Sequence, residues 1–301
     1  MLSREHEWVW DSWYVVEGEE LHAFYLMAPK SLGNPDLRHI NARVGHSVSL
    51  DAHNWTHLPE VFGPSKHGFD DQAIWTGSIV KEGAKWHLFY TGINQRTKER
   101  VQQVGHATSE DLRTWTRVNP DPILSAASPY AVLSNSKDGA EHFRDPWVFD
   151  LYGEWQMLVT ANEPSGWATI AHATSPDLAQ WTLKDPLVTE IQIGQFEVTQ
   201  TINIDGQGVL VFCANEHDIK RAGVRGGFGT YAVPAAGPLG PFNLDKTHLF
   251  AEGIYAARAV KFQDKWILLG FMDDGIPGSF SGAICDPLEL RLTTEGNLEV
   301  V

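Results

Sequence analysis

The chain has 301 residues, of which 43% are apolar, 38 are acidic and 23 are basic, so its formal net charge is −15. A surface with this excess of negative charge repels nucleic acid and anionic membranes, which argues against both as partners. No run approaches the roughly 18 consecutive apolar residues of a membrane-spanning helix, and the charged start lacks the apolar segment of a secretion signal, so we expect a cytoplasmic protein.

Five pairs of strand-like runs follow one another, each pair joined by a turn rich in glycine or charge. The first runs cover residues 8–16, 74–81, 145–150, 197–204 and 255–262. The second runs cover residues 21–28, 86–93, 155–161, 209–214 and 266–272. Two short apolar runs around a tight turn are typical of a β-hairpin, and helical periodicity is hard to find, so the sequence predicts an all-β fold.

A pattern of His, Ser, Asp and Trp at offsets 0, 3, 5 and 9 follows the first three hairpins. Its copies begin at His46, His106 and His172 and end at Trp55, Trp115 and Trp181. A short pattern that recurs at intervals of 60 and 66 residues indicates one structural unit built several times. We predict that the Asp accepts backbone N–H groups in a turn and that the Trp packs between units, away from the centre. The histidines are expected to be structural, because residues present in every copy cannot all line one site.

Five units in 301 residues predict a five-bladed β-propeller that forms one domain over residues 1–301. The first strand of each unit is expected to be innermost, so that its start faces a central funnel that holds the site. The fourth unit, near residues 195–243, carries no clear copy of the repeat, and the fifth is expected to be cut short by the chain end.

Carboxylates stand near the start of three predicted inner strands. Asp11 lies in Trp-Asp-Ser-Trp, Asp145 in Phe-Arg-Asp-Pro and Glu197 in Gln-Phe-Glu-Val. A buried strand disfavours Asp and Glu unless they are paired or functional. A role in a turn is a fair alternative for Asp145, which precedes Pro146, and a weaker one for Asp11 and Glu197. Three acids that converge from different blades are typical of a glycosidase.

The motifs around these acids resemble those of a known clan. Trp10-Asp11-Ser12-Trp13 and Arg144-Asp145-Pro146 resemble the nucleophile and transition-state-stabiliser motifs of the levansucrases, glycoside hydrolase family 68, and their order and spacing also resemble those of the invertases and fructanases of family 32. Further similarities to the clan lie in Ile74-Trp75-Thr76-Gly77-Ser78, in Val44 to Trp55 and at Tyr255. The clan has a five-bladed propeller catalytic domain. Because 301 residues leave no room for the C-terminal β-sandwich of family 32, the layout is judged nearer to family 68.

The resemblance implies a role for each acid: Asp11 as nucleophile, Glu197 as general acid/base and Asp145 as the stabiliser that bonds sugar hydroxyls. By the same resemblance, the sugar site is shaped by Trp10, Trp75, Thr76, Arg144 and Tyr255. The implied function is a retaining hydrolase or transglycosylase of β-fructofuranosides such as sucrose or short fructans. A small carbohydrate is then the partner, and no cofactor is needed. In such a mechanism the two working carboxyls lie about 5–5.5 Å apart, and a partly apolar pocket is expected to raise the pKa of Glu197.

The surroundings of Glu197 differ from the clan pattern, since Val198 and Thr199 follow it and Gln195 replaces the first Glu of the family 68 motif. The leaving group therefore stays open. One alternative is an inverting furanosidase of the arabinanase or xylosidase type, with working carboxyls about 6.5–9.5 Å apart. Another is a sugar-binding propeller without catalysis.

Other functional groups give little support for different chemistry. Cys213 and Cys285 are far apart and are expected to be free thiols. The 13 histidines form neither a His-x-His nor a His-Glu-x-x-His cluster, so no metal site is expected. Hydrolysis versus transfer, exo versus endo preference and the oligomeric state are left open by the sequence.

Overall fold

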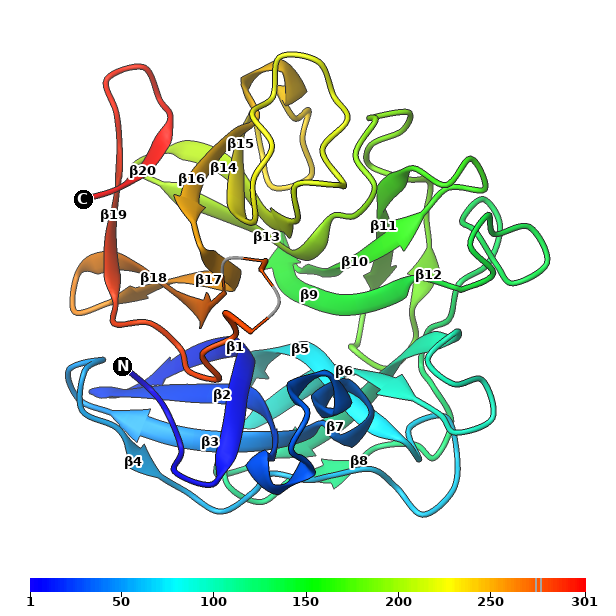
Figure 1. Ribbon diagram of the computed structural model, residues 1–301, viewed down its shortest axis with the longest axis vertical. Coiled ribbons are helices and arrows are strands. Elements are labelled where there is room, and N and C mark those ends of the chain that lie inside the picture. The colour runs from blue at the N-terminus through cyan, green and yellow to red at the C-terminus, as the bar shows by residue number, and fades with distance from the viewer. Residues whose placement is uncertain (274, 277) are drawn as a thin grey trace.

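The computed structural model describes residues 1–301 except 274 and 277, and these residues form five four-stranded antiparallel sheets around a common axis (Figure 1). In each sheet the strands neighbour one another in chain order, as expected for the blades of a propeller. The fifth sheet has four strands, so the expectation that it is cut short is wrong. No helix among the described residues is long and apolar enough to cross a membrane.

The first strand of each sheet lies nearest the axis. These strands are β1 (Glu7–Glu17), β5 (Ala73–Glu82), β9 (Phe143–Leu151), β13 (Glu197–Ile204) and β17 (Ile254–Phe262). Each contacts the first strand of the sheets on both sides, and the contact between β17 and β1 closes the ring. The five predicted inner strands are therefore confirmed.

The remaining strands extend each sheet outward. The second strands are β2 (Glu20–Pro29), β6 (Lys85–Ile93), β10 (Glu154–Asn162), β14 (Gln207–Ala214) and β18 (Lys265–Met272). The third are β3 (Arg43–Ser49), β7 (Gln102–Ser109), β11 (Ala168–Ser175), β15 (Gly229–Ala235) and β19 (Leu288–Leu292). The outermost are β4 (Thr56–His57), β8 (Thr116–Arg117), β12 (Thr182–Leu183), β16 (His248–Glu252) and β20 (Leu298–Val300). Three short 3₁₀ helices are described: η1 (Lys30–Leu32), η2 (Pro35–Asn41) and η3 (Leu244–Lys246).

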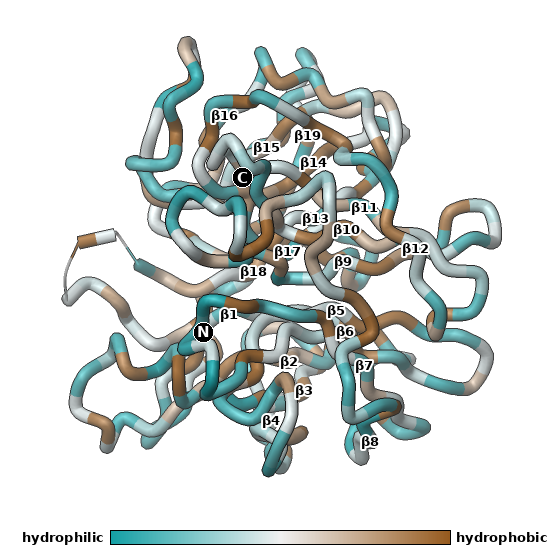
Figure 2. The backbone as a smooth tube through the Cα atoms, turned by 90° about the vertical axis from the view of Figure 1, so that its right-hand side faces the viewer, coloured by the Kyte–Doolittle hydropathy of each residue, from teal (hydrophilic) through white to brown (hydrophobic). Residues whose placement is uncertain are grey.

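The core lies between neighbouring sheets. The second strands read as nearly unbroken apolar runs because adjacent sheets cover both of their faces; in β2 every residue from Leu21 to Ala28 is buried. Figure 2 shows hydrophilic segments gathered along the peripheral loops.

The repeated Ser-x-Asp element forms the predicted turn in all three copies. Oδ1 of Asp111 accepts the backbone N–H groups of Arg113 (2.8 Å) and Thr114 (2.7 Å). Asp51 and Asp177 accept the N–H groups two and three residues further on in the same way.

The repeated tryptophans pack between sheets, as predicted. Trp115 meets Phe24 of the preceding sheet edge-on, with ring centroids 5.8 Å apart, and Trp181 meets Phe89 in the same way at 5.6 Å. Trp55 packs against a cluster that includes Phe262 of the fifth sheet. The same type of contact thus links neighbouring sheets at several points around the ring.

The repeated histidines are structural, as predicted. Nε2 of His46 lies 2.9 Å from Nδ1 of His22, and His106 pairs with His87 at the same distance. His172 instead lies 2.8 Å from Oε1 of Gln156. The two cysteines, Cys213 and Cys285, are buried free thiols.

Candidate active site

Each inner strand is interrupted by a β-bulge near its start. In β1, Trp10 pairs with Leu26 and Ser12 with Tyr25, so Asp11 has no partner across the sheet. In β5 the pairing register shifts in the same way, so Thr76 has no partner across the sheet. The corresponding shifts in the other strands skip residues 145–146, 198–199 and 256–257. A bulge bends its strand and redirects side chains, and the five bulges mark ten equivalent positions near the axis, nine of which line a cavity.

These ten positions form two rings. The pre-bulge ring consists of Trp10, Trp75, Arg144, Glu197 and Tyr255. The bulge ring consists of Asp11, Thr76, Asp145, Val198 and Ala256. Every site residue predicted from the sequence belongs to one of the rings. All of these predicted residues line one cavity of about 390 Å³. The repeated tryptophans do not line this cavity, which agrees with their structural role.

Four of the five bulge-ring residues have a left-handed backbone. Their φ angles are +23° at Asp11, +58° at Asp145, +52° at Val198 and +46° at Ala256. Such a conformation costs on the order of 1–3 kcal/mol in a residue other than glycine and persists only where surrounding contacts impose it. Here the Asp145 N–H donates to Oγ1 of Thr91 (2.9 Å) and the Val198 N–H donates to Oδ2 of Asp145 (3.1 Å). The bulges of β9 and β13 therefore hold each other.

Asp11 is half-buried in the cavity wall and accepts a short hydrogen bond from Oγ1 of Thr76. Burial and the nearby charge of Asp145 raise its pKa to about 7, although the Thr76 bond acts in the opposite direction. The Asp11 carboxyl is therefore partly protonated and partly ionised near neutral pH.

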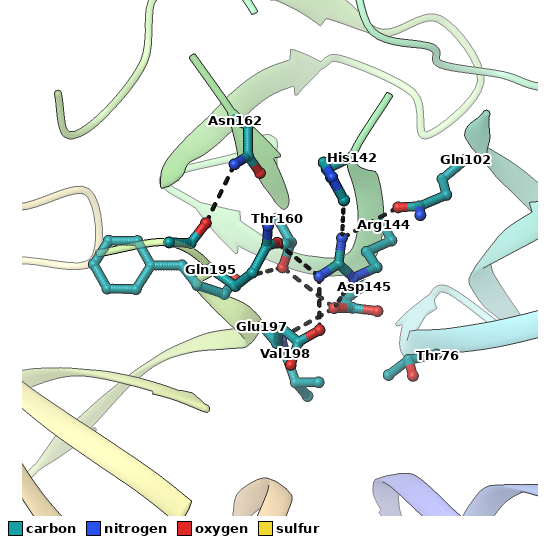
Figure 3. Close-up of polar contacts among 12 residues, drawn as sticks. Thr76, Gln102, His142, Arg144, Asp145, Thr160, Asn162, Gln195, Glu197 and Val198 are labelled. Atoms are coloured by element: carbon teal, nitrogen blue, oxygen red, sulfur yellow. Dashed lines mark hydrogen bonds and ion pairs between the residues drawn. The ribbon is translucent and has the colours of Figure 1, made fainter. Parts of the chain in front are cut away.

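Arg144 connects the two other carboxylates. Its Nη2 donates to Oε1 of Glu197 (2.6 Å) and to Oε1 of Gln195 (2.8 Å), and its Nε lies 3.6 Å from Oδ2 of Asp145 (Figure 3). Planar guanidinium donors fix such partners in both distance and direction. Arg144 is thus a hub that positions Glu197 and Asp145.

The third guanidinium nitrogen of Arg144, Nη1, also has hydrogen-bonding partners. Nη1 of Arg144 lies 3.2 Å from Oε1 of Gln102 and 3.0 Å from Nδ1 of His142 (Figure 3). Because His142 accepts at Nδ1, its proton lies on Nε2, which is 2.6 Å from Oδ2 of Asp138. Both terminal nitrogens of Arg144 therefore have hydrogen-bonding partners in the protein, while Nε makes only the longer ion-pair contact with Asp145.

The pKa of Glu197 is lowered, contrary to the expectation from the sequence. Burial alone would raise it, but the positive charge of Arg144 and the hydrogen bonds from Tyr255 and Arg144 outweigh burial. The hydroxyl of Tyr255 donates to Oε2, while Arg144 occupies Oε1. The expected rise in the pKa of Glu197 was wrong because it considered a partly apolar pocket and not these two donors.

Asp145 shows the opposite balance. Burial raises its pKa and prevails over the charge of Arg144. Its Oδ2 accepts the N–H of Val198 and lies 3.3 Å from Oγ1 of Thr160, whose single proton is donated to the carbonyl of Phe196 (2.6 Å), and nothing among the described residues donates to Oδ1. Three carboxyl groups in one cavity thus have three different environments.

Several residues of the cavity wall were not predicted. Arg38 and His39 come from η2, and the carbonyl of His39 accepts from Nε1 of Trp75 (2.7 Å). Phe228 stacks on Tyr255 with ring centroids 4.3 Å apart, and Asp273 also lines the wall. They lie in helical or loop segments without a repeated pattern, so the sequence holds no periodic signal for them.

Comparison with known proteins places this architecture among related chains. The family model described as glycosyl hydrolases family 32 N-terminal domain matches residues 10–274. The chain is 30% identical over 188 residues to the β-fructofuranosidase insoluble isoenzyme CWINV3 of Arabidopsis thaliana, covering 58% of this chain and 30% of that protein. It is 28% identical over 204 residues to a probable sucrose-6-phosphate hydrolase of Vibrio cholerae, covering 66% of this chain and 34% of that protein. The chain thus matches about a third of the length of these relatives.

Solved structures confirm the fold. The inulosucrase from Halalkalicoccus jeotgali bound to kestose superposes with a TM-score of 0.81 at 20% identity, over 99% of this chain and 87% of that one. The Bombyx mori GH32 beta-fructofuranosidase BmSUC1 superposes with a TM-score of 0.77 at 18% identity, over 100% of this chain and 64% of that one.

Proposed function

The chain belongs to glycosyl hydrolase family 32, and we propose that it hydrolyses β-fructofuranosides, or transfers their fructosyl group, in the cavity between its five inner strands. The observation that carries this proposal is the convergence of Asp11, Asp145 and Glu197 in one cavity, each in a different electrostatic environment. The names of the relatives, which include β-fructofuranosidases, a levanase and sucrose-6-phosphate hydrolases, support the substrate class.

In the proposed retaining reaction, Asp11 attacks the anomeric carbon of the fructosyl unit while Glu197 protonates the leaving oxygen. The bond to the leaving group breaks as the bond to Asp11 forms. Glu197, now ionised, then takes a proton from water or from an acceptor hydroxyl, whose oxygen displaces Asp11. The separation of the Asp11 and Glu197 carboxyls, expected to be about 5–5.5 Å, stays a prediction.

The proton positions that these contacts favour set a condition on the reaction. Near neutral pH the Asp11 carboxyl holds a proton part of the time, whereas Arg144 and Tyr255 keep Glu197 ionised. The reaction needs the reverse distribution. A sugar that replaces water around Glu197, or draws a donor of Arg144 away from it, favours protonation of Glu197. Because this removes the negative charge of Glu197, it in turn favours ionisation of Asp11.

Asp145 is suited to the role of stabiliser. Its Oδ2 accepts the N–H of Val198, while Oδ1 accepts no bond from the described residues. We propose that Oδ1 accepts a hydrogen bond from a hydroxyl of the fructosyl ring. This hydrogen bond strengthens as positive charge develops on the ring in the transition state. The closer relation to family 68 expected from the layout stays a prediction.

The test follows the anomeric configuration of the first-formed product by NMR across sucrose, a short fructan, methyl β-D-fructofuranoside and an arabinofuranoside. We expect retention with the fructosides. Inversion would contradict the mechanism, and turnover of the arabinofuranoside alone would contradict the substrate class. Binding of sucrose without any turnover would identify a sugar-binding propeller instead.

A further inference from the structure

Arg258, on β17, is one of the largest fully buried side chains of the described residues, with 1% of its surface exposed. It stands two residues after Ala256 of the bulge ring and does not line the cavity of the candidate site. It therefore lies behind the cavity wall, where it acts on a substrate only through other residues.

The guanidinium of Arg258 reaches a sheet that is not a neighbour of its own. Among the inner strands, β17 packs on β13 and β1, whereas β9 packs on β13 and β5. The Cζ atom of Arg258 nevertheless lies 4.8 Å from the centroid of the Trp147 ring on β9, and its Nη1 donates to the carbonyl of Thr199 on β13. One side chain thus joins three sheets near the axis.

Both contacts adjoin the groups that anchor Asp145. Trp147 stands two residues after Asp145, and Thr199 follows Val198, whose N–H donates to Oδ2 of Asp145 (3.1 Å). Val198 and Thr199 are the two residues that the bulge of β13 skips, and Val198 has a left-handed φ of +52° that persists only where surrounding contacts impose it. The bond from Arg258 is one of these contacts.

The charge of Arg258 has no hydrogen-bonded acid to neutralise it. Nε and Nη2 are buried and have no hydrogen-bonding partner among the described residues. Burial lowers the pKa of Arg258 to about 10, while the charges of Asp145, Cys213 and Asp11, in that order, oppose the fall. The guanidinium is therefore charged at neutral pH, in an interior where a charge acts more strongly than in water.

Other charged groups face Asp145 from the strands around it. Burial raises the pKa of Asp145, the guanidinium of Arg144 on β9 opposes this rise, and the charge of Glu197 on β13 adds to it. Arg144 is itself bound to Glu197 (2.6 Å), and Asp11 on β1 also interacts with the charge of Asp145. Arg258 is a second positive charge that opposes the rise, and it is hydrogen-bonded to neither carboxylate.

Resting on the proposed function, in which Asp145 stabilises the transition state, we propose that Arg258 is a positioning residue: its bond to Thr199 holds the segment that anchors Asp145, and its charge favours the ionised form of that carboxylate. An ionised carboxylate accepts stronger hydrogen bonds than a neutral acid and stabilises developing positive charge better. Loss of the Arg258 charge weakens catalysis without removing any residue of the cavity wall.

The first experiment follows the titration of Asp145 by carbon-13 NMR of protein labelled at its aspartate carboxyl carbons, with the Asp145 signal identified by its loss in Asp145→Asn. Arg258→Gln keeps a donor for the Thr199 carbonyl but removes the charge, so the midpoint should rise by at least about one pH unit. Arg258→Lys, which keeps a positive charge, should show a smaller rise.

Arg258→Met fills much of the same space without charge and enters the same titration, so the result does not depend on a single variant that folds. Near-ultraviolet circular dichroism checks the fold of each variant. Midpoints in Arg258→Gln and Arg258→Met that match the parent chain would overturn the inference.

The second experiment compares kcat on sucrose for the parent chain and Arg258→Gln at pH 5.5 and pH 8. We expect a loss of at least about fivefold at pH 5.5 and a smaller loss at pH 8, because the higher pH ionises Asp145 again. KM should stay within about threefold, since Arg258 does not line the cavity. A loss of equal size at both pH values would mean that Arg258 serves packing alone, which would overturn the inference.

Arg117→Met is the matched control. The Arg117 guanidinium also lies over an aromatic ring, Phe62 at 4.5 Å, but it pairs with Asp70 (2.7 Å) and does not line the cavity. Any change in kcat in this variant should be the same at both pH values. If the parent chain turns over no fructoside, the proposed function fails, whereas the NMR titration still decides whether Arg258 controls the charge of Asp145.

Discussion

The copied turns and the two rings differ in how they use strained backbone. In the turns, Ala52, Leu112 and Leu178 all have φ near +60°, and each follows an aspartate that accepts the next backbone N–H groups. In the bulge ring the strained residues are two aspartates, a valine and an alanine, and no common set of hydrogen bonds accompanies them. The strain of the turns thus recurs with one set of Asp-centred hydrogen bonds and serves the fold, whereas the strain of the bulge ring places Asp11 and Asp145 at the cavity.

The electrostatic environments differ in the same way. The aspartates of the three turns are exposed, and backbone N–H groups lower the pKa of each of them. The carboxyls of Asp11, Asp145 and Glu197 have pKa values that are respectively raised, raised and lowered. Carboxyls that gather in one cavity and have unlike pKa values distinguish a candidate site from a repeated structural element.

The strongest test of this distinction is the loss of a ring carboxylate. Asp11→Asn and Glu197→Gln should each lower kcat on sucrose by at least about 10³-fold, because each removes a group that acts in the transition state. Asp111→Asn in a copied turn should leave kcat within about twofold. Turnover is measured with a coupled glucose assay, and near-ultraviolet circular dichroism checks the fold. A comparable loss in Asp111→Asn would remove the distinction between the two regions.

The tryptophans of the repeat should affect stability and not catalysis. Trp115→Ala deletes a half-buried ring that packs on Phe24 of the preceding sheet and should lower the free energy of unfolding by about 2–3 kcal/mol. Urea denaturation measures the loss. The folded variant should keep its KM, and a changed KM would mean that the interface between sheets shapes the cavity.

Asp11 should reduce stability as the pH rises. Its pKa in the folded state is about 7, above the ordinary value of 3.8, so the folded protein binds the proton more tightly than the unfolded chain. The stability that this gives is complete below about pH 4 and is lost as the pH rises to 7. The full difference amounts to ~4 kcal/mol, but the half-exposed position at the cavity wall allows screening by solvent, so we expect about 2 kcal/mol.

Asp11→Asn should therefore be more stable than the parent chain at pH 8 and lose this advantage at pH 4. Thermal unfolding at both pH values measures the difference. Equal melting temperatures at pH 8 would show that the carboxylate is solvated well enough to ionise without cost.

The smallest expected effect is the loss of one turn aspartate. Asp111→Asn keeps one acceptor oxygen for the Arg113 and Thr114 N–H groups but removes its charge, and should lower stability at pH 7 by about 1 kcal/mol or less. Because the Asp111 pKa is lowered to about 2, the difference should persist at pH 5 and fade only as the pH falls toward 2. Urea midpoints at the three pH values test this, and a difference that grows on acidification would contradict it.

Much of the fold and all of the ring residues chosen for the site follow from the sequence. The hairpin pattern locates the inner strands, and carboxylates beside Trp10 and Arg144 mark positions that a buried strand would otherwise exclude. The pKa of Glu197 was predicted in the wrong direction because its partners, Arg144 and Tyr255, belong to other blades. Nothing local to Glu197 reveals that the guanidinium and the phenol converge on it.

The contribution of η2 was also beyond prediction. Arg38 and His39 reach the cavity from a short polar segment whose position depends on the packing of β2 and β5, and no periodicity marks such a segment.

The five bulges have a consequence for how this architecture can change. Below each bulge the strand pairing resumes in regular register, so the ladder that holds a blade does not depend on which side chains stand in the rings. The ring pairs are nevertheless joined across blades, by the bonds of Thr76 to Asp11, of the Val198 N–H to Asp145, and of Arg144 and Tyr255 to Glu197, so a change in one blade must be matched in its neighbour. Substitutions in the rings therefore change the cavity wall without breaking the strand ladder of a blade, and a change of specificity by mutation or design begins with pairs of ring residues on neighbouring blades.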